Sequence, residues 1–325
     1  MEAVERPLTR GATAMKACRL LLPLIWLWVV SACTPTPAID QQSGLAKVLV
    51  INSNQSIPRY QTAETGFKST LRRTRMVSVD LGDDQQPTET LQDLLNQEPY
   101  AVIYCIGAKA LGSIEYLAPD TPVVYSSVLS WRRFQHQPGY FGISSEVAPA
   151  AQLAWFKYFF PAIQRIGVMY SDTNSALLED ARHAAEALSL TLVTTRVHDP
   201  ADIPPQQAGL MQQADALWVL PDPVVLNSEA DTYRLFAQAE QLGKPVFAYN
   251  SFFMGLGATL SINPDLLTSG RQAALIARRL LQRTPPESKV QFPAGSSISL
   301  NLRKVNQYQL QLNRDALQQV NELLE

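Results

Sequence analysis

Serine and asparagine side chains cluster where short apolar runs of this sequence end. The clearest case follows the run 165–170, where Asn174 and Ser175 precede a helix-forming segment that begins at Ala176. The free backbone N–H groups of a helix start, together with such side chains, can bind an anionic group. The pattern therefore predicts a strand, a loop and a helix whose junction binds the anionic part of a ligand.

Similar junctions follow other apolar runs, and in open parallel sheets ligands bind at these loops, beyond the carboxyl ends of the strands. The loops are rich in serine and asparagine and include aromatic residues, which suits a small polar or zwitterionic molecule with an apolar part. The predicted ligand-binding residues are Asn54, Ser56, Arg59, Tyr60, Gly107, Ala108, Ser126, Ser127, Tyr170, Asp172, Asn174, Ser175, Asp222, Tyr249, Asn250 and Phe252.

Each of these residues also has an alternative role without a ligand. Serine and asparagine are common in turns and at helix N-caps. Arg59 can be a solvated charge at a helix start instead of a carboxylate clamp, and Asp222, between two prolines, can shape a turn instead of pairing with a ligand ammonium group. Tyr60, Tyr249 and Phe252 can simply pack. The ligand hypothesis therefore depends on all of these residues lying at one edge.

Binding energy indicates that the ligand must be enclosed. A helix start contributes about 0.3–1 kcal/mol to the binding of an anion, whereas micromolar affinity needs about 8 kcal/mol. Apolar or aromatic enclosure between two closing lobes must therefore supply much of the remainder.

The elements that must position these residues alternate between strands and helices. From Lys47 onward, β-branched runs separated by amphipathic segments are typical of βαβ units, which form a parallel sheet with helices on both faces. Two such blocks follow one another, so we expect an α/β fold with two Rossmann-like lobes and a three-crossing hinge. The first lobe is predicted to comprise residues 47–140 and 254–283, with the strand 257–262. The second comprises 141–253 and 284–325, with a terminal helix at 310–324.

The N-terminal segment has the features of an export signal. Residues 20–30 are apolar but too few to span a membrane, and Lys16 and Arg19 precede them. This order is typical of a secretory signal peptide, predicted here at residues 1–32, with Met15 as an alternative start.

The end of that signal resembles a bacterial lipobox. Small residues precede Cys33, which in such a motif receives lipid and becomes the mature N-terminus; ordinary signal cleavage beside an incidental cysteine is the alternative. Residues 33–46 would then hold the folded part to a membrane as a polar tether. Thr34 in place of Asp favours the outer membrane over the inner one. We therefore expect a lipid-anchored protein that faces the periplasm.

Composition and missing motifs argue against several classes of protein. The 325 residues contain 27 Lys plus Arg against 29 Asp plus Glu, which gives no electrostatic reason to expect nucleic acid. His136, His183 and His198 are scattered without metal-ligand spacing, and no nucleotide-loop, redox or nucleophile-elbow motif occurs. Cys105 lies in an apolar run, so we expect a buried thiol and no disulfide. We expect no enzyme activity, no cofactor and no metal.

Several segments carry a resemblance to a known family: 122–125 (Pro-Val-Val-Tyr), 159–170, 174–175 (Asn-Ser), 243–248 and 270–274. With them, residues 47–306 resemble ABC-transporter substrate-binding proteins of the tryptophan/tyrosine-binding type, which have a type I periplasmic binding protein fold. The resemblance implies that Asn174 and Ser175 hold the ligand carboxylate, while Gly107 and Ala108 approach it from the first lobe. The chain departs from the family where Pro-Asp-Pro at 221–223 replaces a common Asp-Asn pair, and where Leu-Ser-Trp-Arg-Arg at 129–133 replaces small residues.

Two hypotheses of function follow. The first is a lipid-anchored solute-binding protein of an ABC-type uptake system, which closes over a small ligand such as an amino acid and hands it to an inner-membrane permease. The alternative is a cell-envelope lipoprotein of the same fold that regulates or senses through protein contacts. An outer-membrane location would favour the alternative, because a permease lies in the inner membrane.

Overall fold

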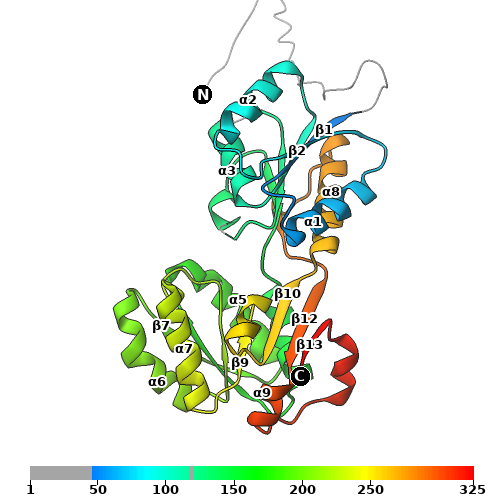
Figure 1. The fold of residues 1–325 in the computed structure, drawn as a ribbon. Coiled ribbons are helices and arrows are strands. Elements are labelled where there is room, and N and C mark those ends of the chain that lie inside the picture. The colour runs from blue at the N-terminus through cyan, green and yellow to red at the C-terminus, as the bar shows by residue number, and fades with distance from the viewer. Residues whose placement is uncertain (1–45, 118–119, 130) are drawn as a thin grey trace, which may run out of the picture. The chain divides into compact units, whose positions relative to one another are not determined.

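The computed structural model describes residues 46–117, 120–129 and 131–325 (Figure 1). The predicted signal peptide, Cys33, Thr34 and all but the last residue of the predicted tether lie outside the described residues. Within the described part, the elements form an α/β structure with two sheets, as the sequence predicts. None of the described helices is long and apolar enough to cross a bilayer.

The first sheet has six parallel strands in the order β11-β5-β4-β3-β1-β2. Its strands are β1 (Lys47–Asn52), β2 (Arg75–Asp80), β3 (Val102–Ile106), β4 (Val123–Ser126), β5 (Tyr140–Ile143) and β11 (Val290–Gln291). The accompanying helices are α1 (Pro58–Thr70), α2 (Pro87–Gln97), α3 (Ala108–Leu117), the short η1 (Trp131–Phe134) and α8 (Leu266–Leu281).

Alternation along β1 explains how helices cover both faces of this sheet. Val48 and Val50 pack into a core with α1 and α8, whereas Leu49 and Ile51 pack into a second core with α2 and α3. A strand buried on both faces needs an unbroken apolar run, which is the pattern that the sequence has here.

The second sheet has seven strands in the order β13-β12-β10-β9-β8-β6-β7, of which only the β10–β12 pair is antiparallel. Its strands are β6 (Arg165–Tyr170), β7 (Thr191–Arg196), β8 (Ala216–Trp218), β9 (Val246–Ala248), β10 (Leu260–Pro264), β12 (Ser296–Asn301) and β13 (Glu322–Leu324). The helices are α4 (Pro149–Phe159), η2 (Asp172–Asn174), α5 (Ser175–Ala187), η3 (Pro200–Asp202), α6 (Ile203–Gln213), α7 (Glu229–Gln241), η4 (Ser251–Leu256), α9 (Leu302–Gln307) and η5 (Arg314–Gln319).

The chain passes between the two sheets three times, which confirms the predicted hinge. It crosses after β5 through residues 144–148, returns between β10 and α8 at Asp265, and crosses again between β11 and β12 through residues 292–295. Asp265 also caps α8, because its Oδ1 accepts a hydrogen bond from the Thr268 backbone N–H at 3.0 Å.

Three strand placements differ from the expected lobe boundaries. The strand expected at 257–262 in the first lobe is β10, and it pairs with β9 and β12 in the second sheet. The strand β11, assigned to the second lobe, pairs with β5 in the first sheet, so residues 141–143 also belong there. The physical reason is that the chain passes from one sheet to the other only where its strand pairing ends, at Asp265 and after Gln291.

The predicted terminal helix 310–324 is wrong. The chain instead forms η5 and then β13, whose residues pair in parallel with β12. The Asn313 side chain accepts a hydrogen bond from the Asp315 backbone N–H at 3.1 Å and starts a new short helix. Edge pairing with β12 outweighs the helical propensity of the last residues.

Helices α1 and α8 lie side by side against the first sheet (Figure 1). Gly66 and Gly270 allow this close approach. A Cβ atom on Gly270 would lie 2.0 Å from the carbonyl oxygen of Ala63, and one on Gly66 would lie 2.2 Å from that of Leu267. The backbones therefore touch, and this contact positions the start of α1.

Candidate ligand-binding site

Three cavities meet at Leu129, in the loop that follows β4. We call the first, of about 510 Å³, the serine cavity, because serines such as Ser127 and Ser297 line it. The second, of about 430 Å³, is the aromatic cavity, lined by Tyr233, Tyr249 and Phe252 among others. A third, the proline cavity of about 440 Å³, includes Pro221 and Pro223.

Shared wall residues place these three cavities next to one another in one region. Leu129 lines all three; Arg59 and Asn250 line the serine and aromatic cavities; Tyr249 lines the aromatic and proline cavities. Arg59 and Leu129 belong to loops or helix starts of the first sheet, whereas Tyr249 and Asn250 follow β9 of the second. Side chains from both sheets therefore line the same space.

Six of the predicted residues line this region: Arg59, Ser127, Asp222, Tyr249, Asn250 and Phe252. The other ten do not line these three cavities: Asn54, Ser56, Tyr60, Gly107, Ala108, Ser126, Tyr170, Asp172, Asn174 and Ser175.

Arg59 offers the region a positive charge. Its Nη2 donates to the hydroxyl of Tyr60 at 2.9 Å, and its guanidinium lies 4.7 Å from the centroid of that ring. Tyr60 is buried, so its ring and hydroxyl hold the arginine side chain in place. Among the described residues no carboxylate pairs with Arg59, whereas Arg132 pairs with Glu146 and Arg133 with Glu115.

The loop between β1 and α1 is satisfied by its own hydrogen bonds. Asn54 Oδ1 accepts from the Ser56 backbone N–H at 2.9 Å and from its hydroxyl at 2.5 Å, and the Asn54 backbone N–H donates to Asn52 Oδ1 at 3.0 Å. Asn52 Nδ2 in turn donates to the buried Glu64 at 2.7 Å. Asn54 and Ser56 thus shape the turn that precedes Arg59.

The start of α3 also has internal partners. The hydroxyl oxygen of Ser53 accepts from the Ala110 backbone N–H at 3.0 Å. Gly107 has φ +88°, and a Cβ atom there would lie 2.5 Å from Ser53 Oγ, so only glycine allows this packing. Gly107 and Ala108 therefore form a tight junction between two loops.

The two serines that end β4 differ in their surroundings. Ser126 is fully buried, and its hydroxyl lies 2.7 Å from that of Tyr104. Ser127 has φ +59°, and its buried Oγ has no hydrogen-bond partner within the described protein while the residue lines the serine cavity. An unpaired buried hydroxyl is costly, so Ser127 is the one of the pair that a ligand could satisfy.

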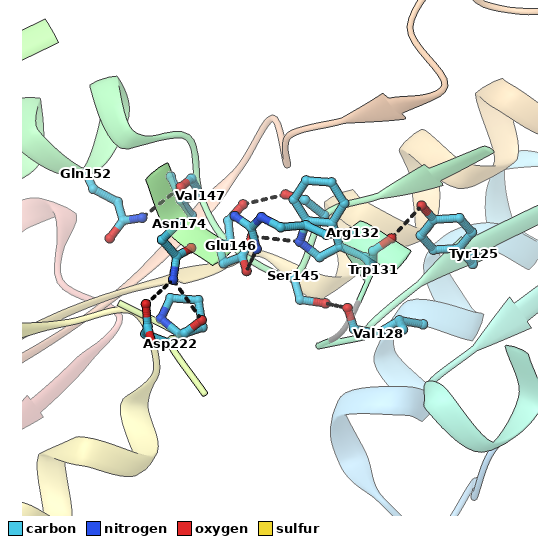
Figure 2. Close-up of polar contacts among 12 residues, drawn as sticks. Tyr125, Val128, Trp131, Arg132, Ser145, Glu146, Val147, Gln152, Asn174 and Asp222 are labelled. Carbon is cyan, nitrogen blue, oxygen red and sulfur yellow. Dashed lines mark hydrogen bonds and ion pairs between the residues drawn. The ribbon is translucent and has the colours of Figure 1, made fainter. Parts of the chain in front are cut away.

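In the second sheet, Asp222 organises the loop after β6. Its carboxylate accepts hydrogen bonds from the backbone N–H groups of Ser171 at 2.7 Å, Val224 at 3.0 Å and Val225 at 3.2 Å. It also accepts one from Asn174 Nδ2 at 2.9 Å (Figure 2). Asp222 is 1% exposed. Four donors saturate a carboxylate, so the turn-shaping role applies and no lone pair remains for a ligand ammonium group.

The start of α5 retains unsatisfied polar atoms. Asn174 Oδ1, Ser171 Oγ and Ser175 Oγ are buried without hydrogen-bond partners among the described residues, and Asn174 gives α5 no side-chain cap. Asp172, by contrast, pairs with Arg196 on the surface. Asn174 and Ser175 remain predicted ligand residues, but Asn174 presents a carbonyl oxygen, because its N–H groups already bond Asp222 and the Pro221 carbonyl.

After β9, Asn250 fixes the aromatic wall. Its side chain accepts from the Phe252 backbone N–H at 2.9 Å and caps η4, which leaves Phe252 66% exposed. Burial, followed by the negative charge of Glu146, raises the pKa of Tyr249 to about 12. The Tyr249 hydroxyl therefore stays protonated at neutral pH and can donate a hydrogen bond.

Sequence reasoning missed Glu146, which positions the loop that carries Leu129. Glu146 is 2% exposed and accepts from Trp131 Nε1 at 2.7 Å and from Arg132 Nη1 at 2.8 Å (Figure 2). The Arg132 guanidinium also lies 4.4 Å from the centroid of the Trp131 ring. The carboxylate lies in a hinge segment, so the hinge and the Leu129 loop form one hydrogen-bonded unit.

The groups at this site are suited to binding a ligand. No group of His, Cys, Asp and Glu residues in the described part could hold a metal ion. Cys105 is fully buried, and burial raises the pKa of its thiol, so it is inert as a nucleophile. What the residues supply is a cation, hydroxyl and amide groups, and exposed rings.

Comparison with known proteins gives a family and a fold. The family model described as ABC transporter substrate binding protein matches residues 63–323. A comparison with curated proteins finds no match. Among solved structures, an ABC domain from Streptococcus pneumonia in complex with L-Trp is 17% identical, with a TM-score of 0.55 over 86% of this chain and 100% of that one.

A second solved structure has a higher TM-score. It is a ligand-free, open substrate-binding protein with adhesive properties from Clostridium difficile, 16% identical, with a TM-score of 0.63 over 86% of this chain and 99% of that one. A conserved domain protein from Vibrio cholerae is 18% identical, with a TM-score of 0.54 over 86% and 99%. At these identities the likeness concerns the fold.

Proposed function

Because the chain belongs to the ABC transporter substrate-binding protein family, whose members are extracytoplasmic binding proteins and not enzymes, we propose that it captures a small polar or zwitterionic solute, such as an amino acid or related metabolite. The solute would then pass to an inner-membrane ABC permease. One observation carries the proposal: Arg59, Leu129, Tyr249 and Asn250, which come from loops or helix starts of two different sheets, line adjoining cavities.

The contacts suggest how such a solute would bind. The Arg59 guanidinium, free of any carboxylate partner among the described residues, would take the ligand carboxylate. Hydrogen bonds to a charged group contribute about 1.5–3 kcal/mol. The Ser127 hydroxyl and the Tyr249 hydroxyl would add polar contacts, and closure of the two halves would bury the exposed Leu129.

Membrane attachment is part of the same proposal. A lipid on Cys33 would tether the folded part to a membrane, and the outer membrane, which Thr34 favours, would suit the alternative function better than delivery to an inner-membrane permease. Metabolic labelling of the full chain with a fatty-acid probe should mark the native protein and leave the Cys33→Ser variant unlabelled. If both proteins are labelled, Cys33 is not the site of lipidation and this part of the proposal is wrong.

Ligand capture is tested by thermal unfolding of the full chain, purified in detergent, with each of the L-amino acids and related metabolites. A ligand at 100 times its Kd stabilises the folded state by about 2.7 kcal/mol, which raises the melting temperature. Arg59→Gln should weaken the affinity of the ligand found by roughly 10- to 100-fold. Arg72→Gln is the matched control and should leave affinity unchanged, because Arg72 lies just beyond the C-terminus of the same helix and donates to the Ser69 carbonyl.

Failure of the panel favours the second function. If no solute changes the melting temperature, the proposal of capture is wrong, and a lipoprotein that regulates or senses through protein contacts becomes the better hypothesis. Crosslinking in the intact envelope would then identify the partner, and recovery of permease subunits would bring back the transport role.

A further inference from the structure

Exposed apolar side chains gather around the aromatic cavity. Phe252 is 66% exposed, Leu129 56% and Tyr233 49%, and all three line that cavity together with the partly buried Tyr249. They come from three separate elements: η4, the loop after β4, and α7. Apolar groups left in contact with water at one concave place mark a binding surface.

The neighbouring serine cavity has the opposite chemistry. Hydroxyl and amide groups line it, including those of Ser127, Ser297 and Asn263, and no aromatic side chain is among its described walls. Two carboxylates also line it, and each accepts a hydrogen bond from a neighbouring hydroxyl: Asp265 from Thr268 at 3.0 Å and Glu322 from Ser299 at 2.8 Å. Asn263 is held in place, since its Nδ2 donates to the Ser297 carbonyl at 3.0 Å. Such a surface suits a portion of a ligand that carries several hydroxyl groups.

Arg59 lies at the border between the two cavities and lines both. Its guanidinium has a neutral partner, the Tyr60 hydroxyl, and no carboxylate partner among the described residues. A guanidinium without a carboxylate partner beside an open cavity favours a ligand with a carboxylate or phosphate at that point. The order along the region is thus aromatic wall, cation, hydroxyl wall.

We propose that the serine and aromatic cavities form one bipartite site for a ligand that joins a planar aromatic ring to a hydroxyl-rich, anionic portion. The ring lies against Phe252, Tyr249 and Leu129, the anionic group contacts Arg59, and the hydroxyl groups bind in the serine cavity. This inference rests on the proposed function and narrows it. A single amino acid fills one compartment and leaves the other to water, whereas a conjugate uses both.

The test compares conjugates with their fragments by isothermal titration calorimetry on the full chain in detergent. The conjugates are uridine 5′-monophosphate and 4-methylumbelliferyl β-D-glucuronide, which carry the shared chemistry from a nucleotide and from an aryl glycoside. The fragments are ribose 5-phosphate and uracil for the nucleotide, and glucuronate and 4-methylumbelliferone for the glycoside. We expect at least one conjugate to bind more than about tenfold more tightly than each of its fragments, because ring stacking adds to the polar contacts.

Variants separate the two compartments. Phe252→Ala should weaken the better conjugate by about tenfold and leave its polar fragment unaffected, while Arg59→Gln should weaken both. Tyr116→Ala is the control, since Tyr116 is 84% exposed on α3 and lines none of the three cavities. All three substitutions are at exposed side chains, and an unchanged melting temperature verifies that each variant is folded.

Each outcome decides between the two proposals. Conjugates that bind no better than fragments, or a conjugate unaffected by Phe252→Ala, overturn the bipartite site. If an L-amino acid binds and both conjugates are silent, the bipartite site is wrong while solute capture stands. If no conjugate, fragment or amino acid binds, the result counts against both the bipartite site and solute capture.

Discussion

The contact between α1 and α8 predicts that one methyl group will have opposite effects at two glycines. Gly270→Ala would place a Cβ atom 2.0 Å from the carbonyl oxygen of Ala63. Ordinary contact between such atoms begins near 3.5 Å, so the helices must separate by roughly 1.5 Å. The atom in the way belongs to the backbone and cannot rotate aside.

The magnitude follows from two opposing terms. Overpacking of this kind costs about 1–3 kcal/mol, and the rigid backbone contact places Gly270→Ala at the upper end of that range. Replacing a helical glycine by alanine returns about 1 kcal/mol of helix propensity. We expect a net loss of about 2 kcal/mol, which for a protein of this size lowers the melting temperature by about 4–8 °C.

Gly112 is the matched control. It lies within α3, and a Cβ atom there meets nothing within 4 Å. Gly112→Ala should therefore stabilise the protein by about 0.5–1 kcal/mol through helix propensity alone. The same chemical change thus has opposite signs at two helical sites.

Urea unfolding followed by circular dichroism, together with thermal scans, measures both variants against the native chain. A Gly270→Ala protein as stable as the native one would refute the close backbone contact, and so would two variants that shift in the same direction. Because α1 begins beside Arg59, separation of the helices should also weaken ligand affinity in Gly270→Ala and leave it unchanged in Gly112→Ala.

Three further predictions concern carboxylates. Asp222→Ala should lower the free energy of unfolding by about 3 kcal/mol, because it leaves the buried donors around Asp222, Asn174 included, without an acceptor. Urea unfolding measures this loss, and a loss below about 1 kcal/mol would contradict the role of Asp222 in holding the turn. Glu146→Gln removes a buried ion pair at the hinge and should shift tryptophan emission and lower stability by about 1–3 kcal/mol; an unchanged spectrum would contradict it. The Lys47 ammonium, which donates to Glu98 at 2.5 Å, lowers the pKa of Glu98 below its ordinary 4.5, so the pair stabilises the fold above that value and loses its effect as pH falls through the lowered pKa. Lys47→Met should therefore destabilise the protein at pH 7 and progressively less as the pH falls below 4.5, as thermal scans over this range will show.

The two-sheet fold could be predicted because its signals are local. Strands buried on both faces, such as β1 and β3, must be unbroken apolar runs, and the intervening amphipathic segments must be helices. The end of the chain lacked such a signal. Pairing of β13 with β12 joins residues 23 positions apart, and nothing in the spacing of Leu310, Leu317 and Leu323 distinguishes that arrangement from a helix.

The same distinction between local and distant signals applies to the residues of the candidate site. Arg59 and Asn250 were predicted because each follows a strand end, where parallel sheets bind ligands. Leu129 was missed because an apolar residue in a loop is ordinarily expected to pack against the protein. Only the structure shows that it is exposed where three cavities meet. Glu146 was missed because its partners Trp131 and Arg132 lie 14 to 15 positions away and on another element.

Asp222 shows how a buried contact sets the polarity of a neighbouring binding residue. Its carboxylate can only accept, so it fixes Asn174 with the amide N–H groups inward and Oδ1 as the free atom. A ligand that reaches Asn174 must therefore supply a donor, such as an ammonium, hydroxyl or amide N–H group. An anion at the start of α5 would instead have to bind the backbone N–H groups and the Ser175 hydroxyl, which is buried without a hydrogen-bond partner among the described residues.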